Sequence, residues 1–139
     1  MILKTSNGTN GILAARNAQE TLFSCFVNIN ATVEYIIKHS PQKVTLVGMG
    51  ASGGRCAEDD LCAELLKNSL ENKSTDLRQI KQILRKSAAA QKFFNPNQLE
   101  FPEQDFYYCM ELNRCCFSMR VERKKEELEI RKYVVDMSV

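Results

Sequence analysis

Three consecutive carboxylates, Glu58, Asp59 and Asp60, stand where a helix is expected to begin. Carboxylate oxygens are ligands that Mg²⁺ prefers, and an ion held by two of them keeps positions for water and a phosphoryl group. Acidic residues at a helix start also oppose the positive end of the helix dipole and accept hydrogen bonds from unpaired N–H groups, without any metal. The spacing alone leaves both interpretations open.

A second group of candidate residues is the turn formed by Asn7, Gly8 and Thr9, which follows Thr5 and Ser6. Hydroxyl groups, an amide and unpaired backbone N–H groups at a helix start can receive a phosphate. The same residue types are common in plain turns between elements, so the turn by itself favours a structural explanation. It also lacks the lysine of a Walker loop.

Glycines gather between Gly48 and Gly54, after the apolar run 44–47 and directly before Arg55. A glycine loop that follows a buried strand is where α/β sheets usually bind ligands, and the charge of Arg55 suits an anionic ligand. The glycines at 48, 50 and 53 match the GxGxxG dinucleotide pattern only loosely, and no supporting acid follows a second strand at the expected distance. Nucleotide binding is therefore kept as a third hypothesis.

Charge and thiol patterns argue against several other classes of site. The 19 basic and 17 acidic residues are spread along the chain and give a formal charge of +2, so we expect no nucleic-acid partner. No membrane-spanning or signal-like segment is evident, so we expect a cytoplasmic protein without a membrane partner. Six cysteines form no CxxC pair, and His39 is the single histidine, which argues against structural zinc and a cysteine nucleophile. We expect reduced thiols, most of them in the core.

The elements that position these residues are expected to alternate between strands and helices. The chain is long enough for one core, and we expect a single α/β domain over residues 1–139, with a mixed or parallel sheet flanked by helices. Alternating apolar residues predict a hairpin that turns at Lys124–Glu127, although KKEELEIRKY also suits a helix. In the helix after Asn30, its expected N-cap, we expect Val33, Ile36 and Ile37 to point inward. The remaining expected elements are strands at 1–5, 21–27, 44–47 (buried and parallel) and 106–110, and helices at 12–18, 30–38, 59–72 and 76–92.

In order and spacing, several of these motifs resemble those of the 2-phosphosulfolactate phosphatase (ComB-like) family. The resemblance runs from Thr5 to about Val121 and corresponds to the second half or more of a family member. The family's Asp-x-x-Arg-Ala-[ST] motif has no counterpart in these 139 residues. Asn10 stands where the family usually has a basic residue, Ile29 replaces alanine, and Glu64 replaces glycine. The matching residues are the turn 5–9 (TSNGT), the segment 26–28 (FVN), Gly50, the run 58–63 (EDDLCA), and Asp105 with Cys109.

The resemblance implies magnesium-dependent hydrolysis of a small acidic phosphoester, with 2-phosphosulfolactate giving sulfolactate and phosphate on the route to coenzyme M. It implies that Glu58 and Asp59 hold Mg²⁺ or orient the attacking water. The substrate-binding residues are then Asn7, Gly8, Thr9 and Asn28, with Arg55 added for its charge alone. The alternative is an inactive or incomplete domain that binds an anion or a partner chain. Because a sheet without all its strands exposes an apolar edge or face, we also expect a homo-oligomer.

Overall fold

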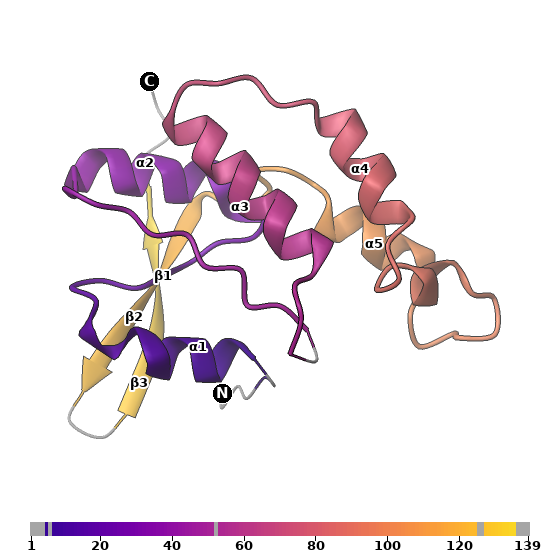
Figure 1. Cartoon of the computed structure of the whole chain (residues 1–139), viewed down its shortest axis with the longest axis horizontal. Coiled ribbons are helices and arrows are strands. Elements are labelled where there is room, and N and C mark those ends of the chain that lie inside the picture. Colours follow the sequence, from indigo (N-terminus) through magenta and orange to yellow (C-terminus); the bar gives the residue numbers. More distant parts are fainter. Residues whose placement is uncertain (1–4, 6, 52, 125–126, 136–139) are drawn as a thin grey trace.

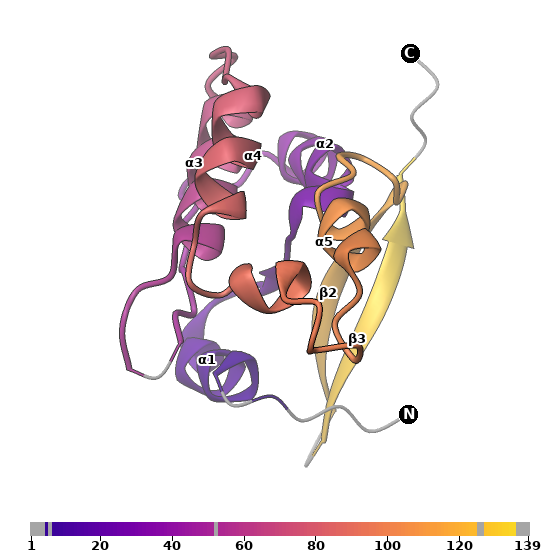
Figure 2. The same cartoon turned by 90° about the vertical axis from the view of Figure 1, so that its right-hand side faces the viewer.

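The structure is a computed structural model that describes residues 5, 7–51, 53–124 and 127–135. Figures 1 and 2 show helices α2 and α3 on the same side of the sheet, and the long hairpin β2–β3 forming the opposite layer. In chain order the elements are α1 (Gly8–Ala14), η1 (Ala15–Asn17), β1 (Leu22–Phe23), η2 (Phe26–Asn28), α2 (Ile29–His39), α3 (Ala57–Leu70), α4 (Leu77–Arg85), η3 (Gln91–Phe94), α5 (Glu103–Cys109), β2 (Phe117–Lys124) and β3 (Glu127–Val134).

The sheet of the described residues has three strands in the order β1-β2-β3, and both pairings are antiparallel. The register of β2 and β3 runs from Phe117 opposite Val134 to Lys124 opposite Glu127. This confirms the predicted hairpin and excludes the helical alternative for the strand residues, while positions 125–126 of its turn lie outside the described residues. The prediction came from apolar residues that alternate with polar ones, a pattern typical of a strand because its successive side chains point to opposite faces.

The predicted parallel strand at 44–47 is wrong for the described part of the chain. These residues form no strand, and Val44, Leu46 and Val47 are exposed, Val47 by 69%. The described sheet is antiparallel throughout, so a parallel sheet is not formed either. A continuous apolar run marks a strand that is covered on both faces, and such a strand needs neighbours to pair with. No described strand pairs with this segment.

Other element predictions were partly right. The expected strand 106–110 is wrong, because these residues lie in α5 and its C-cap. Phe106 and Met110 are both buried, and a spacing of four residues brings two side chains to one face of a helix. The expected strand 21–27 shrinks to β1 and is followed by η2, and the expected helix 12–18 begins earlier, at Gly8. The expected strand at 1–5 falls almost entirely outside the described residues.

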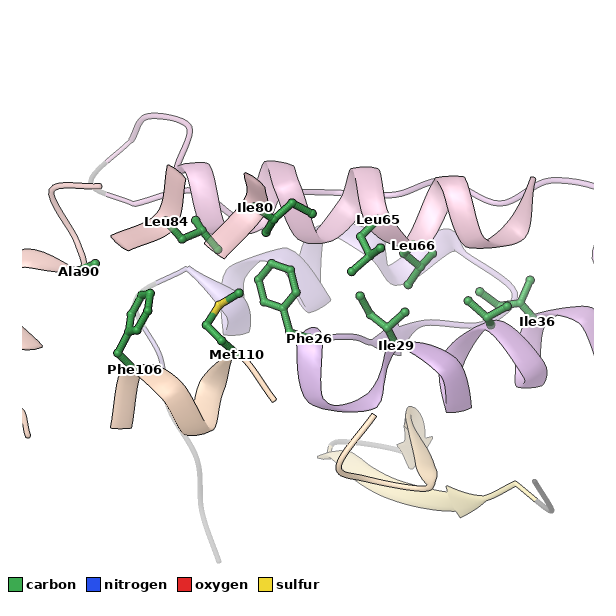
Figure 3. Close-up of a cluster of buried hydrophobic side chains, with 11 residues drawn as sticks. Phe26, Ile29, Ile36, Leu65, Leu66, Ile80, Leu84, Ala90, Phe106 and Met110 are labelled. Atoms are coloured by element: carbon green, nitrogen blue, oxygen red, sulfur yellow. The ribbon is translucent and has the colours of Figure 1, made fainter. Parts of the chain in front are cut away.

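The core lies between the helices, around the start of α2. Figure 3 shows Phe26 and Ile29 pointing toward Leu65 of α3 and Ile80 of α4. Burial of one such side chain contributes about 1.5–3 kcal/mol. Val33 and Ile36 are buried as predicted, whereas Ile37 is 53% exposed, which contradicts its expected inward position. The cluster consists of Phe26, Ile29, Val33, Ile36, Leu65, Leu66, Ile80, Leu84, Ala90, Phe106 and Met110.

The six cysteines are all free, and none is fully buried, so the expectation that most belong to the core is wrong. Cys25, Cys109 and Cys116 are exposed, and the other three are intermediate. Among the described helices, none is long and apolar enough to cross a membrane.

Candidate functional site

Two hydrogen bonds join three of the motifs that the sequence singled out. The side-chain amide of Asn7 donates from Nδ2 to the Gly50 carbonyl oxygen at 2.6 Å. The Gly50 N–H donates to Oδ2 of Asp59 at 2.7 Å. Asn7 is the N-cap residue of α1, Gly50 lies in the glycine loop, and Asp59 belongs to the first turn of α3. The folded chain thus brings together segments that lie more than forty residues apart in sequence.

The glycine at position 50 is required by its backbone conformation and by its surroundings. Its φ of +68° lies in the left-handed region, which side chains other than glycine rarely adopt. A Cβ added there would overlap the carbonyl oxygen of Gly54. That oxygen accepts the Ala51 N–H at 2.9 Å, and the Gly54 N–H returns a bond of equal length to the Ala51 carbonyl. The loop therefore closes on itself and presents both the N–H and the C=O of Gly50 outward to the neighbouring motifs.

Helix α1 also packs against the loop. A Cβ on Gly11 would overlap the side chain of Met49, so the loop lies directly on the helix at this point. At the start of the helix, the N–H of Thr9 donates to Oγ1 of Thr5 at 3.3 Å, and the N–H of Thr5 donates to Oγ1 of Thr9 at 3.2 Å. One N–H at the start of α1 is thus already bonded within the turn. The two hydroxyl groups keep their own protons for a further acceptor.

The three acids of α3 have different partners. Asp59 tethers the loop through Gly50, and Oδ2 of Asp60 accepts a bond from Nε of Arg55 at 3.0 Å. The carboxylate of Glu58 forms no hydrogen bond or ion pair with the described residues. None of the three side chains caps a helix N–H, so the structure disfavours simple capping as the role of the run. The side chain of Arg55 is 86% exposed, and its ion pair is with Asp60.

Two carboxylates, Glu58 and Asp59, match in chemical type the magnesium ligands implied by the sequence. Within the described part of the chain, no group of three or more histidine, cysteine, aspartate or glutamate side chains is arranged to hold a metal ion. Mg²⁺ is commonly held by one or two carboxylates, with water and substrate phosphate completing its coordination. The available protein oxygens therefore suit a shared site, in which the substrate supplies ligands, and not an all-protein cage.

Asn28 has a different environment from the other predicted binding residues. It is 1% exposed, and its Oδ1 accepts the Cys25 N–H at 2.8 Å. Its Nδ2 donates to the carbonyl oxygens of Phe23 and Phe117, at 3.3 and 3.5 Å. These bonds connect β1, η2 and β2. Asn28 thus holds the sheet to the start of α2, and none of these bonds reaches Asn7, Gly50 or Asp59.

The thiols near this region are poor nucleophiles at neutral pH. Burial, aided by Cys25 and Asp59, raises the pKa of Cys62 to about 12. Burial also raises the pKa of Cys56, which is partly buried. Because the thiolate is the reactive form, these shifts agree with the argument from sequence against cysteine catalysis.

The sequence did not predict a polar cluster centred on Arg120. Its guanidinium donates to Glu20 at 3.0 Å and to the hydroxyl of Tyr35 at 3.3 Å, and it also contacts Glu122 and Tyr133. Burial and the hydrogen bond with Glu20 raise the pKa of Tyr35. The only available signal was the position of Arg120 and Glu122 on one face of a predicted strand. Their partners come from distant elements, which spacing along the chain does not reveal.

Comparison with known proteins supports the resemblance found in the sequence. The family model described as 2-phosphosulpholactate phosphatase matches residues 1–124, and this chain belongs to that family. A protein of Bacillus subtilis named "Probable 2-phosphosulfolactate phosphatase" is 29% identical over 137 residues, which is 97% of this chain and 59% of the relative. A protein of the same name from Pseudothermotoga lettingae is 34% identical over 111 residues, 76% of this chain and 48% of the relative. The chain thus spans about half to three fifths of these relatives. No solved structure matches it.

Proposed function

We propose that the Asn7, Gly50 and Asp59 cluster is the binding and reaction site of a magnesium-dependent phosphatase. The observation that carries the proposal is the pair of hydrogen bonds through Gly50, because they join the turn that the family resemblance links to phosphate with a carboxylate that it links to the metal. Asp59 uses Oδ2 for the loop, so Oδ1 is the oxygen that we assign to Mg²⁺. Glu58 is the second carboxylate of the proposed site.

The proposed reaction is hydrolysis of a phosphate monoester. Water attacks phosphorus and gives up a proton as its oxygen bonds to phosphorus, the P–O bond to the leaving alcohol oxygen breaks, and that oxygen takes up a proton. A bound Mg²⁺ would neutralise charge on the phosphoryl oxygens. The hydroxyl groups of Thr5 and Thr9 would donate to the same oxygens, and the carboxylate of Glu58 would orient the attacking water. Most of the rate acceleration then comes from positioning and charge stabilisation, as in other phosphoryl transfers.

The proposed substrate is a small acidic phosphoester, with 2-phosphosulfolactate as the first choice because the relatives carry its name. Arg55 is the cation that the sequence assigned to an anionic ligand. Its ion pair with Asp60 is exposed and therefore weak, so the side chain can exchange partners at low energetic cost. A cytoplasmic location is part of the same proposal.

The second candidate function is anion binding without turnover. It is favoured by one observation in particular, which is that no group of three or more metal-binding side chains is found among the described residues. The chain also spans only 59% of the Bacillus subtilis relative. In this case the turn and the loop bind phosphate but do not hydrolyse a phosphoester.

The experiment is phosphate release from racemic 2-phosphosulfolactate and phospholactate by the purified chain, with Mg²⁺ and with a chelator. The informative variant is Asp59→Asn, which keeps the size of the side chain and removes its charge. Asp60→Asn is the matched control, because it removes the same charge one residue further along the same helix. We expect Mg²⁺-dependent release that is lost in Asp59→Asn and retained in Asp60→Asn. Phosphate binding without release would favour the second candidate, and neither binding nor release would contradict both.

A further inference from the structure

Strand β3 forms one edge of the described sheet. The strand order is β1-β2-β3, and the register pairs of β3 are all with β2. Two backbone hydrogen bonds show to which side each residue of β3 directs its N–H and C=O groups. Val121 of β2 donates its N–H to Thr21 on the β1 side at 2.9 Å, and Val135 donates to Cys116 at 3.1 Å as the β2–β3 ladder ends. Successive residues of a strand direct their N–H and C=O groups to opposite sides. Because Val135, directly after β3, bonds to Cys116, directly before β2, the odd-numbered residues of β3 also bond to β2.

The even-numbered residues of β3 therefore direct their N–H and C=O groups away from the sheet. These residues are Leu128, Ile130, Lys132 and Val134. In the part of the chain that the structure describes, no strand pairs with these groups. An unpaired edge of eight residues is a template for pairing with another chain. Figure 2 shows the β3 side of the hairpin facing away from α2 and α3.

We propose that a second copy of this chain pairs with β3, antiparallel, about a twofold axis at Ile130. In this register Ile130 lies opposite its own copy, and Leu128 lies opposite Lys132 of the second copy. Both are hydrogen-bonded pairs, because both partners direct their polar groups to the edge, and they give about six backbone hydrogen bonds. The result is one continuous six-stranded sheet with an isologous interface.

Charge selects this register among its neighbours. With Ile130 on the axis, Glu129 lies opposite Arg131 of the second copy, and this happens twice because of the symmetry. These are non-hydrogen-bonded pairs, in which side chains on facing strands come closest. Moving the axis to Glu129 places two glutamates opposite each other, and moving it to Arg131 does the same with two arginines. The exposed charges contribute little affinity, so their main effect is on register and specificity.

The side chains of the edge fit a partner of the same kind. Leu128, Ile130 and Val134 share the sheet face that does not carry Arg120, and they are 39%, 43% and 70% exposed. In the dimer the apolar faces of the two hairpins become continuous. Edge pairing of this length buries less surface than the roughly 1,200 Å² of a standard stable interface. We therefore expect a weak dimer whose population rises with protein concentration.

The test uses sedimentation velocity of the full chain over a wide concentration range. Glu129→Arg places two basic residues next to Ile130 in each chain, and Arg131→Glu places two acidic residues there. Each variant alone then sets like charges opposite each other, whereas a mixture restores two opposite-charge pairs per dimer. We expect each variant to be monomeric where the native chain dimerises, and we expect the mixture to form a heterodimer. Glu100→Arg, an exposed charge reversal outside β3, is the control and should leave the dimer unchanged.

A second measurement needs no variant. In the native chain, amide hydrogen exchange at Ile130 and Lys132 should slow as concentration rises, while exchange at other exposed amides should not. A native chain that is monomeric throughout the range would overturn the proposal. So would a dimer that survives both charge reversals, which would mean that another surface is used, or exchange at Ile130 that does not depend on concentration.

Discussion

Replacing Gly50 with alanine tests whether the loop closure described above is what holds the candidate site together. Alanine in the left-handed region costs about 1–2 kcal/mol. At Gly50 the new Cβ must also displace the Gly54 carbonyl, which takes part in the reciprocal pair of bonds with Ala51. Losing two such bonds costs about 1–3 kcal/mol, so we expect Gly50→Ala to lower the free energy of unfolding by about 2–5 kcal/mol.

Gly53→Ala is the matched control for this prediction. Its φ is +80°, so alanine there meets the same backbone strain, but no atom lies within 4 Å of the added Cβ. We expect a cost of about 1–2 kcal/mol from strain alone. The assay is urea denaturation followed by circular dichroism, with the unfolding free energies of both variants compared with that of the native chain. Equal destabilisation by the two substitutions would refute the reasoning, since it would mean that the contact with Gly54 has no energetic consequence.

Three further predictions concern the core, a helix start and a thiol. Ile29→Ala should lower the free energy of unfolding by about 2–5 kcal/mol, because Ile29 is 2% exposed within the core cluster, and urea denaturation measures this. Asp76→Ala should cost about 1 kcal/mol in the same assay, because the Asp76 carboxylate caps α4 by accepting the N–H groups of Arg78 and Gln79. Cys62 should react slowly with a thiol reagent at pH 8 and progressively faster as the pH approaches its raised pKa of about 12, as site-resolved mass spectrometry would show. A modification rate that levels off near pH 9 would contradict the last of these.

Parts of the fold that depend on local periodicity could be predicted from the sequence. The hairpin β2–β3 was predicted because alternating side chains leave a clear period of two, and α2 was predicted because Val33 and Ile36 recur at helical spacing. The run Val44–Val47 could not be placed in this way. Its apolar residues suit a buried strand, but whether such a strand forms depends on which neighbours are present, and periodicity carries no information about neighbours.

The candidate site was predictable as a set of motifs but not as a geometry. Asn7 and Asp59 were named as candidates from residue type and family resemblance. The contact between them passes through the N–H and C=O of Gly50. Every non-proline residue carries the same backbone groups, so residue type could not reveal that Gly50 makes this contact. Asn28 was named on the same grounds as Asn7, yet its burial and its bonds to Phe23 and Phe117 give it a structural environment. Its assignment to substrate binding stays a prediction.

The central claim is that Asn7, Gly50 and Asp59 form one site for phosphate and Mg²⁺. The most direct measurement is an NMR titration of the ¹⁵N-labelled chain with inorganic phosphate, with and without Mg²⁺. We predict that the Gly50 amide and the side-chain amide of Asn7 shift together and only when both ions are present, and that Asp59→Asn abolishes the change. Shifts confined to other residues, such as those around Arg120, or no saturable shift at Gly50, would contradict the claim.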